Sequence, residues 1–85
     1  SRTDLPNLEL RLKGSTKVED VWNSYGIDLA AEKGQPLDQL IKEALDGSAR
    51  QGDELMAGSV RLIVREQLQG RITTVGIEAV RRLGL

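Results

Sequence analysis

The chain has 85 residues and a formal net charge of −1, from 12 basic and 13 acidic side chains, so no overall field attracts nucleic acid or a membrane surface. It contains no cysteine and no histidine, which excludes disulfides, thiolate chemistry and imidazole catalysis and removes the usual zinc ligands. No apolar run approaches the roughly 20 residues that span a bilayer. We therefore expect a soluble cytoplasmic domain with no membrane contact, no cofactor and no metal site.

The first strand signal comes after a short lead-in. Residues 1–7 are predicted to be flexible, and residues 8–85 to form a single helical domain. Leu8 to Lys13 alternates apolar and charged side chains up to Gly14, which is typical of a strand. A lone strand leaves its backbone groups without partners, so it must pair with another segment of the chain or with a second molecule.

The next element is an amphipathic helix. It begins near Thr16, whose hydroxyl fits a capping box with the carboxylate of Glu19, and it ends at Gly26. Trp22 and Tyr25 are the only aromatic residues of the chain, and helical spacing places them on one face. The rest of the core must then be aliphatic, which suits close packing of helices.

A second helix is predicted over residues 37–45. Pro36 stands where a first helical turn accepts proline, and the segment ends at Asp46-Gly47. Its apolar residues recur at helical spacing and form one stripe: Leu37, Leu40, Ile41, Ala44 and Leu45.

The organising element is predicted to be a helix over residues 53–69. At about 100° per residue one broad face is apolar, made of Met56, Val60, Ile63, Val64 and Leu68. Leu55 and Leu62 add a second apolar stripe, so the helix is expected to be packed from two sides at the centre of the domain.

The last part of the chain offers two interpretations. Residues 71–75 are rich in β-branched side chains and form either a short strand that pairs with residues 8–13 or, through Thr73 or Thr74, a helix cap. In both cases residues 76–83 are predicted to form a last helix. The fold class we predict is mainly α: a compact bundle of four to five short helices around residues 53–69, with one minor β-element.

Catalysis is not predicted. The adjacent carboxylate pairs Glu19-Asp20 and Asp53-Glu54 lie in predicted helices, where neighbouring side chains point about 100° apart and do not converge on one substrate atom. We interpret them as solvated charges at helix ends. The function expected is therefore a non-enzymatic interaction module, with an accessory, regulatory or assembly role through a protein partner or a homodimer.

The residues expected to bind a protein partner are Trp22 and Tyr25, because large aromatic side chains anchor protein interfaces. The competing interpretation is that both belong to the core. A second function remains open: residues 53–83 outline a helix-turn-helix-like unit that binds nucleic acid. Five arginines lie in it and would meet the phosphates: Arg61, Arg65, Arg71, Arg81 and Arg82. Over residues 59–85, Glu66 and Glu78 reduce the local charge to +3.

Overall fold

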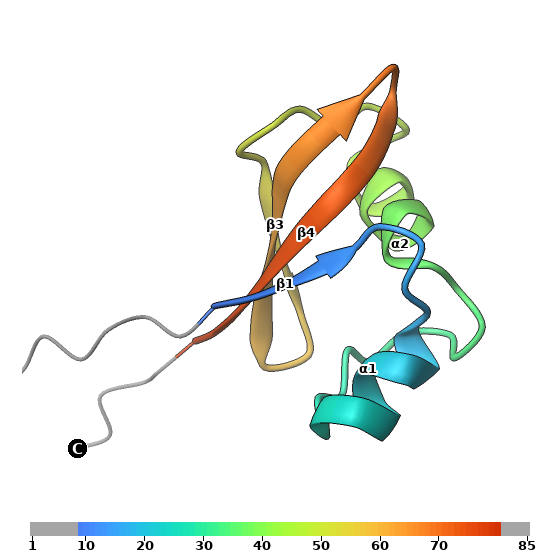
Figure 1. The fold of residues 1–85 in the computed structure, drawn as a ribbon, viewed down its shortest axis with the longest axis vertical. Coiled ribbons are helices and arrows are strands. Elements are labelled where there is room, and N and C mark those ends of the chain that lie inside the picture. The colour runs from blue at the N-terminus through green and yellow to red at the C-terminus, as the bar shows by residue number, and fades with distance from the viewer. Residues whose placement is uncertain (1–8, 81–85) are drawn as a thin grey trace, which may run out of the picture.

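The computed structural model describes residues 9–80, which form a four-stranded antiparallel sheet and two helices (Figure 1). The elements in chain order are β1 (Glu9–Lys13), α1 (Val18–Tyr25), α2 (Leu37–Ala44), β2 (Glu54–Ala57), β3 (Val60–Leu68) and β4 (Arg71–Ala79). The predicted lead-in over residues 1–7 and two of the predicted site residues, Arg81 and Arg82, lie outside the described residues.

The sheet brings the first and last strands together. Its order is β1-β4-β3-β2, and each neighbouring pair is antiparallel. β1 pairs with β4, with Leu12 opposite Val75 and Lys13 opposite Thr74. Both helices lie on one side of the sheet in Figure 1, and the other side is left open. We call these the helix-covered face and the open face.

Tight turns produce the two hairpins that join β2, β3 and β4. Gln69 and Gly70 have φ angles of 52° and 79°, and two consecutive positive values are what a type I′ turn requires. Gly58 has a φ of 60°, which a side chain rarely adopts. A Cβ at Gly58 would also overlap the carbonyl oxygen of Asp28, so this turn packs directly against the loop after α1.

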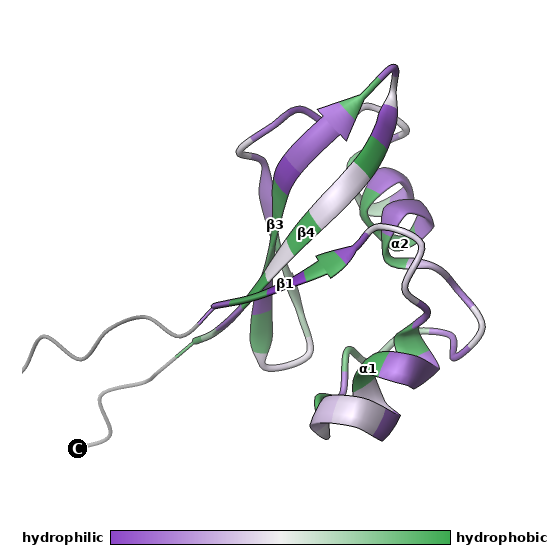
Figure 2. Cartoon of the chain, in the orientation of Figure 1, coloured by the Kyte–Doolittle hydropathy of each residue, from purple (hydrophilic) through white to green (hydrophobic). Residues whose placement is uncertain are grey.

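The core lies between the helices and the helix-covered face. Leu62 and Val64 of β3 and Val75 of β4 are fully buried, as are Leu37 and Ile41 of α2. In Figure 2 the side of α2 that faces the sheet is hydrophobic and its opposite side is hydrophilic. One layer of helix on one layer of sheet is therefore enough to bury the aliphatic residues.

The predicted helical bundle is wrong, because residues 53–69 form β2, a turn and β3 instead of a central helix. The residues of β3 that face the helices alternate, with Val60, Leu62 and Val64 all in the core cluster. Three of the apolar positions from 60 to 64 also fit a helical stripe, which made the pattern ambiguous. Gly58 favours the hairpin over the helix, since glycine inside a helix costs about 1 kcal/mol and glycine in a hairpin turn is favourable.

The other predictions had mixed outcomes. The helix over residues 37–45 is confirmed as α2, and the strand over residues 8–13 is confirmed within its described part as β1, paired with β4. The first helix is confirmed too, but it begins at Val18 and shows no side-chain cap, so the capping box is wrong. The helix predicted over residues 76–83 is wrong within its described part, where β4 continues to Ala79.

Candidate functional site

The two aromatic residues of α1 are exposed. Trp22 is 57% exposed and Tyr25 is 48% exposed, whereas Val18 and Val21 of the same helix are buried in the core. The helix ends one residue after Tyr25, at Gly26, whose φ of 68° is left-handed. The interpretation of these aromatics as core residues is therefore wrong. We call Trp22 and Tyr25 the aromatic face of α1.

A hollow of about 420 Å³ adjoins the aromatic face, between α1 and the loop that follows it. Trp22 lines the hollow together with Ile27 and the buried Leu29. Charged residues also line it, namely Glu19, Asp28 and Lys33. The combination of an apolar wall and charged residues is typical of surfaces that bind another protein, which have an apolar centre and a polar rim.

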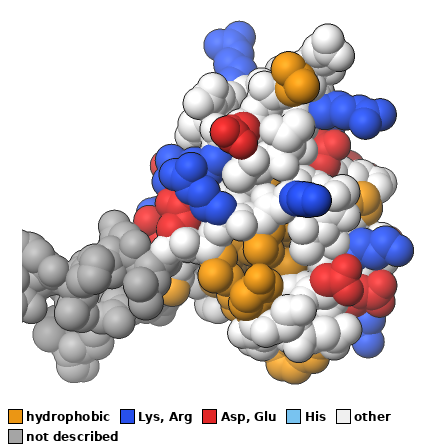
Figure 3. Space-filling model, viewed as in Figure 1, with side chains coloured by type: hydrophobic (Ala, Val, Ile, Leu, Met, Phe, Trp, Pro, Cys, Tyr) orange, Lys and Arg blue, Asp and Glu red, His pale blue; other side chains and the backbone are white. Residues whose placement is uncertain are grey.

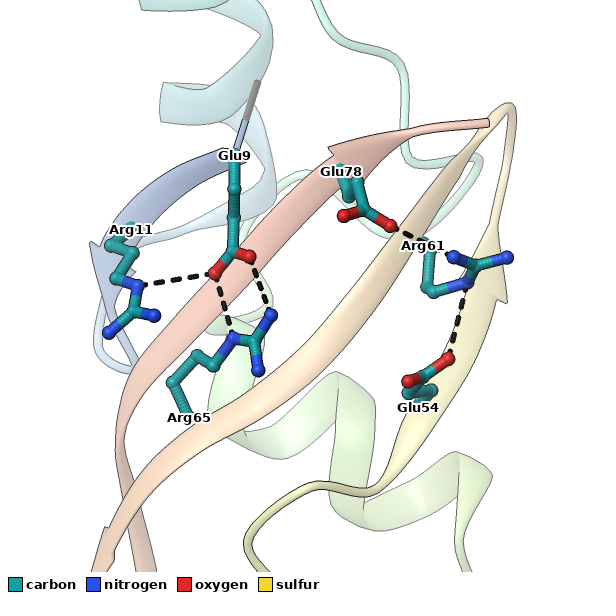
Figure 4. A network of polar contacts seen from close by, with 6 residues as sticks. All are labelled: Glu9, Arg11, Glu54, Arg61, Arg65 and Glu78. Carbon is teal, nitrogen blue, oxygen red and sulfur yellow. Dashed lines mark hydrogen bonds and ion pairs between the residues drawn. The ribbon is translucent and has the colours of Figure 1, made fainter. Parts of the chain in front are cut away.

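A second feature of the surface is an ion pair on the open face, seen in Figure 4. Arg65 of β3 donates two hydrogen bonds to the carboxylate of Glu9 in β1, at 2.8 Å from Nε and 2.6 Å from Nη2. Arg11 donates a third, at 3.2 Å. The carboxylate lies directly over Gly76, where a Cβ would overlap it. Glycine at this position of β4 therefore makes room for the ion pair.

A similar arrangement lies beside it on the same face (Figure 4). Arg61 of β3 contacts the carboxylate of Glu78 in β4 at 2.8 Å and that of Glu54 in β2 at 3.3 Å. Ile63, between the two arginines along β3, is only 3% exposed although it is absent from the main core cluster. The open face is therefore a neutral layer in which arginine and glutamate side chains match one another.

The strands and ion pairs described above differ from the predicted nucleic-acid site. The helix-turn-helix-like unit over residues 53–83 is absent, because its described part consists of three strands. Arg61 and Arg65 are held by carboxylates on the open face, away from the helices, and Arg71 is exposed at the start of β4. The structure does not bring these arginines together with Trp22 and Tyr25.

Sequence reasoning set Glu54 and Glu78 against the arginines but missed Glu9, the carboxylate that holds Arg65. Glu9 and Arg65 are 56 residues apart in the chain, so no local spacing connects them. A signal existed in β3, where Arg61 and Arg65 interrupt a run of buried aliphatic residues. Reading that run with a strand period would have placed both arginines opposite the core.

The ion pair changes the acidity of both partners. The hydrogen bond from Arg65 lowers the pKa of the Glu9 carboxyl, and the charges of Arg65 and Arg11 lower it further. The same hydrogen bond raises the pKa of Arg65. A carboxyl whose pKa is lower in the folded chain stabilises the fold above its unfolded pKa, and that contribution is lost as the pH falls through the folded pKa.

Glu9→Gln is therefore expected to reduce the free energy of unfolding most at neutral pH. The difference from the unmodified chain should shrink as the pH falls below the ordinary glutamate value of 4.5, because the unmodified chain then loses the same contribution. Urea titrations at neutral pH and in acid measure this difference. Glu32→Gln, exposed and in none of the ion pairs described above, is the control for losing one carboxylate. A difference that stays constant with pH contradicts the expectation.

No family model matches the chain, and no curated protein matches it in sequence. Solved structures share its fold. A functionally unknown conserved protein from Haemophilus influenzae Rd KW20 aligns with a TM-score of 0.74 at 17% identity, over 85% of this chain and 89% of that one. A "putative Mg2+ and Co2+ transporter(CorC)associated region" from Neisseria meningitidis MC58 aligns with a TM-score of 0.72 at 19% identity, again over 85% and 89%.

A CorC_HlyC domain from Haemophilus ducreyi aligns with a TM-score of 0.69 at 13% identity, over 87% of this chain and 99% of that chain. At such identities the similarity establishes a shared fold. In the part of the chain that the structure describes, neither helix is long and apolar enough to cross a membrane.

Proposed function

We propose that this chain is a non-enzymatic accessory or regulatory domain that acts by binding a protein partner through the aromatic face of α1. The observation that carries the proposal is the exposure of Trp22 and Tyr25 beside a hollow with an apolar wall. The arginines and glutamates that converge on the open face neutralise one another, which supports a binding role over a catalytic one.

The partner we propose is another domain or subunit of a transport-associated protein. Two proteins of the same fold are described as a CorC_HlyC domain and as a region associated with a Mg2+ and Co2+ transporter. This chain aligns with 99% of the CorC_HlyC domain, so the likeness extends over that whole unit. A likeness of that extent supports an accessory role beside a transporter.

The physical reason for choosing α1 is the free energy available at an aromatic side chain. A buried tryptophan or tyrosine removes about 150–250 Å² from water, and truncating such an anchor at an interface costs about 2 kcal/mol or more of binding. Within the isolated chain Trp22 is 57% exposed, so more than half of its surface can still be buried against a partner.

Photocrosslinking tests this assignment in the complete natural protein in its own cells. A photoreactive amino acid replaces Trp22 in one variant and Asp20 in the control, because Asp20 is exposed on the same helix and lies about 160° around it. We expect a discrete crosslinked protein from position 22 and none from position 20. Trp22→Ala should weaken binding to that protein about 30-fold or more.

Equal crosslinking from both positions, or from neither, contradicts the assignment to α1. A fold control accompanies the experiment, since Trp22→Ala removes little buried surface. Trp22 is 57% exposed, so the free energy of unfolding of that variant should fall by no more than about 2 kcal/mol. Circular dichroism should show it folded, so that a loss of binding cannot be attributed to unfolding.

A further inference from the structure

We propose that two copies of the chain pair antiparallel along β1, joining their sheets into one continuous sheet. This goes beyond the proposed function, because the surface involved is the edge of the sheet and not the aromatic face of α1. Among the described residues 9–80, β1 is an outermost strand, with β4 on one side only. An outer strand has a row of backbone groups that can pair with another strand.

The hydrogen bonds of β1 show which groups are free for pairing. The amide of Gly14 donates to the carbonyl of Thr73 at 3.0 Å, so residues 10, 12 and 14 face β4. Alternate residues of an antiparallel strand face opposite edges, so Glu9, Arg11 and Lys13 direct their amides away from β4. These three residues span the whole described strand. At its end the carbonyl of Lys13 already accepts a hydrogen bond from the Thr16 amide at 3.0 Å, so the groups left for pairing are those of Glu9 and Arg11 and the amide of Lys13.

The sequence of β1 is complementary to itself when reversed. In a two-fold pairing centred on Arg11, Glu9 of each copy lies opposite Lys13 of the other, which forms two attractive pairs across the new strand pair. Leu10 lies opposite Leu12 in the same register. The two Arg11 side chains meet at the centre, and each already contacts the Glu9 carboxylate of its own chain at 3.2 Å.

The opposite edge of the sheet lacks this complementarity. β2 has four residues, and its charged residue Glu54 follows another acid, Asp53. No lysine or arginine lies in or directly beside β2 to oppose these acids in a reversed pairing. Charged residues at an edge strand oppose pairing unless opposite charges face them. Of the two edges, β1 is therefore the one suited to a second copy.

Apolar surface beside β1 adds to the argument. Leu10 and Leu12 are only half-buried, although they pack against the core on the helix-covered face. Figure 3 shows a group of hydrophobic side chains at the surface just below the position of β1 in this view. Pairing along β1 brings the leucines of the second copy against this surface and removes more of it from water.

Two measurements on the full 85-residue chain test the pairing. Sedimentation over a range of concentrations should show a reversible dimer, and Lys13→Glu should weaken it about tenfold or more, because two attractive pairs become repulsive. Arg50→Glu, the same charge change at an exposed loop residue before β2, is the matched control and should leave the dimer intact.

The second measurement locates the contact. The chain has no cysteine, so Arg11→Cys and Met56→Cys each place one thiol on an edge strand. A short bismaleimide should crosslink two copies at position 11, where the two Cα atoms are expected about 5.5 Å apart, and not at position 56. A chain that stays monomeric at every concentration overturns the proposal. So does a dimer that crosslinks through position 56 or is unaffected by Lys13→Glu.

Discussion

Leu62→Ala is expected to lower the free energy of unfolding by about 2–5 kcal/mol, as burial and cavity effects add in a close-packed core. Leu62 is fully buried in β3, where it lies between Leu55 of β2 and Ile77 of β4. The backbones of β2 and β4 are paired with β3 at this position. They cannot move easily to fill the cavity that the substitution leaves. Urea titration of the variant and the unmodified chain measures the loss.

Leu68→Ala is the matched control, because Leu68 lies in the same strand but is 64% exposed. We expect its effect to stay within about 0.5 kcal/mol. The comparison also separates the sheet from the helix predicted over residues 53–69, in which Leu68 belonged to the main buried stripe. Equal losses from the two variants contradict the sheet.

Gly14→Ala is expected to have a still larger effect, a loss of about 4 kcal/mol or more, or failure to fold. Gly14 is buried where β1 ends, and a Cβ there would overlap the backbone carbonyl oxygen of Ile72 in β4. The carbonyl of Gly14 accepts a hydrogen bond from the Asp38 amide at 2.9 Å, which joins the start of α2 to the sheet. Backbone on both sides prevents the neighbours from moving away.

Gly34→Ala is the control for this substitution. Gly34 has no atom within 4 Å of a Cβ built on it, and its φ is not in the left-handed region. We expect a change within about 0.5 kcal/mol, or a small gain from a less flexible unfolded chain. Circular dichroism and denaturant titration follow both variants. A folded Gly14→Ala chain with unchanged stability contradicts the close approach of β1 and β4.

The sequence predicted those elements in which one period fits and the alternative does not. The stripe from Leu37 to Leu45 fits only a helix, and the alternation up to Lys13 fits a strand. Its partner is β4, where the paired residues 74–78 overlap the predicted residues 71–75 only at Thr74 and Val75. From Val60 to Val64 both periods fit, so hydrophobicity could not separate helix from strand. Gly58, which favours a turn, was the residue that could have separated the two.

The surroundings of the candidate residues could not be predicted for a related reason. Helical spacing places Trp22 and Tyr25 together, but their exposure depends on what the other elements cover, which is a tertiary property. The same holds for Glu9 and Arg65, which meet only because β1 pairs beside β4 and β4 beside β3. The spacing of residues along the sequence therefore could not predict a contact across three strands.

Oxidative footprinting of Trp22 tests most directly whether the aromatic face of α1 is a contact surface. Cleavage at lysine and arginine gives one peptide, residues 18–33, with both aromatics and another, residues 51–61, with Met56. Met56 is 54% exposed and is the matched control for Trp22. Each residue is labelled in the purified chain and in the natural protein within its cells.

We predict that Trp22 is labelled readily in the purified chain and is protected several-fold in cells, relative to the change at Met56. Protection at Trp22 alone is what a partner bound to α1 produces. Weak labelling of Trp22 in the purified chain, or equal changes at Trp22 and Met56, would contradict the account.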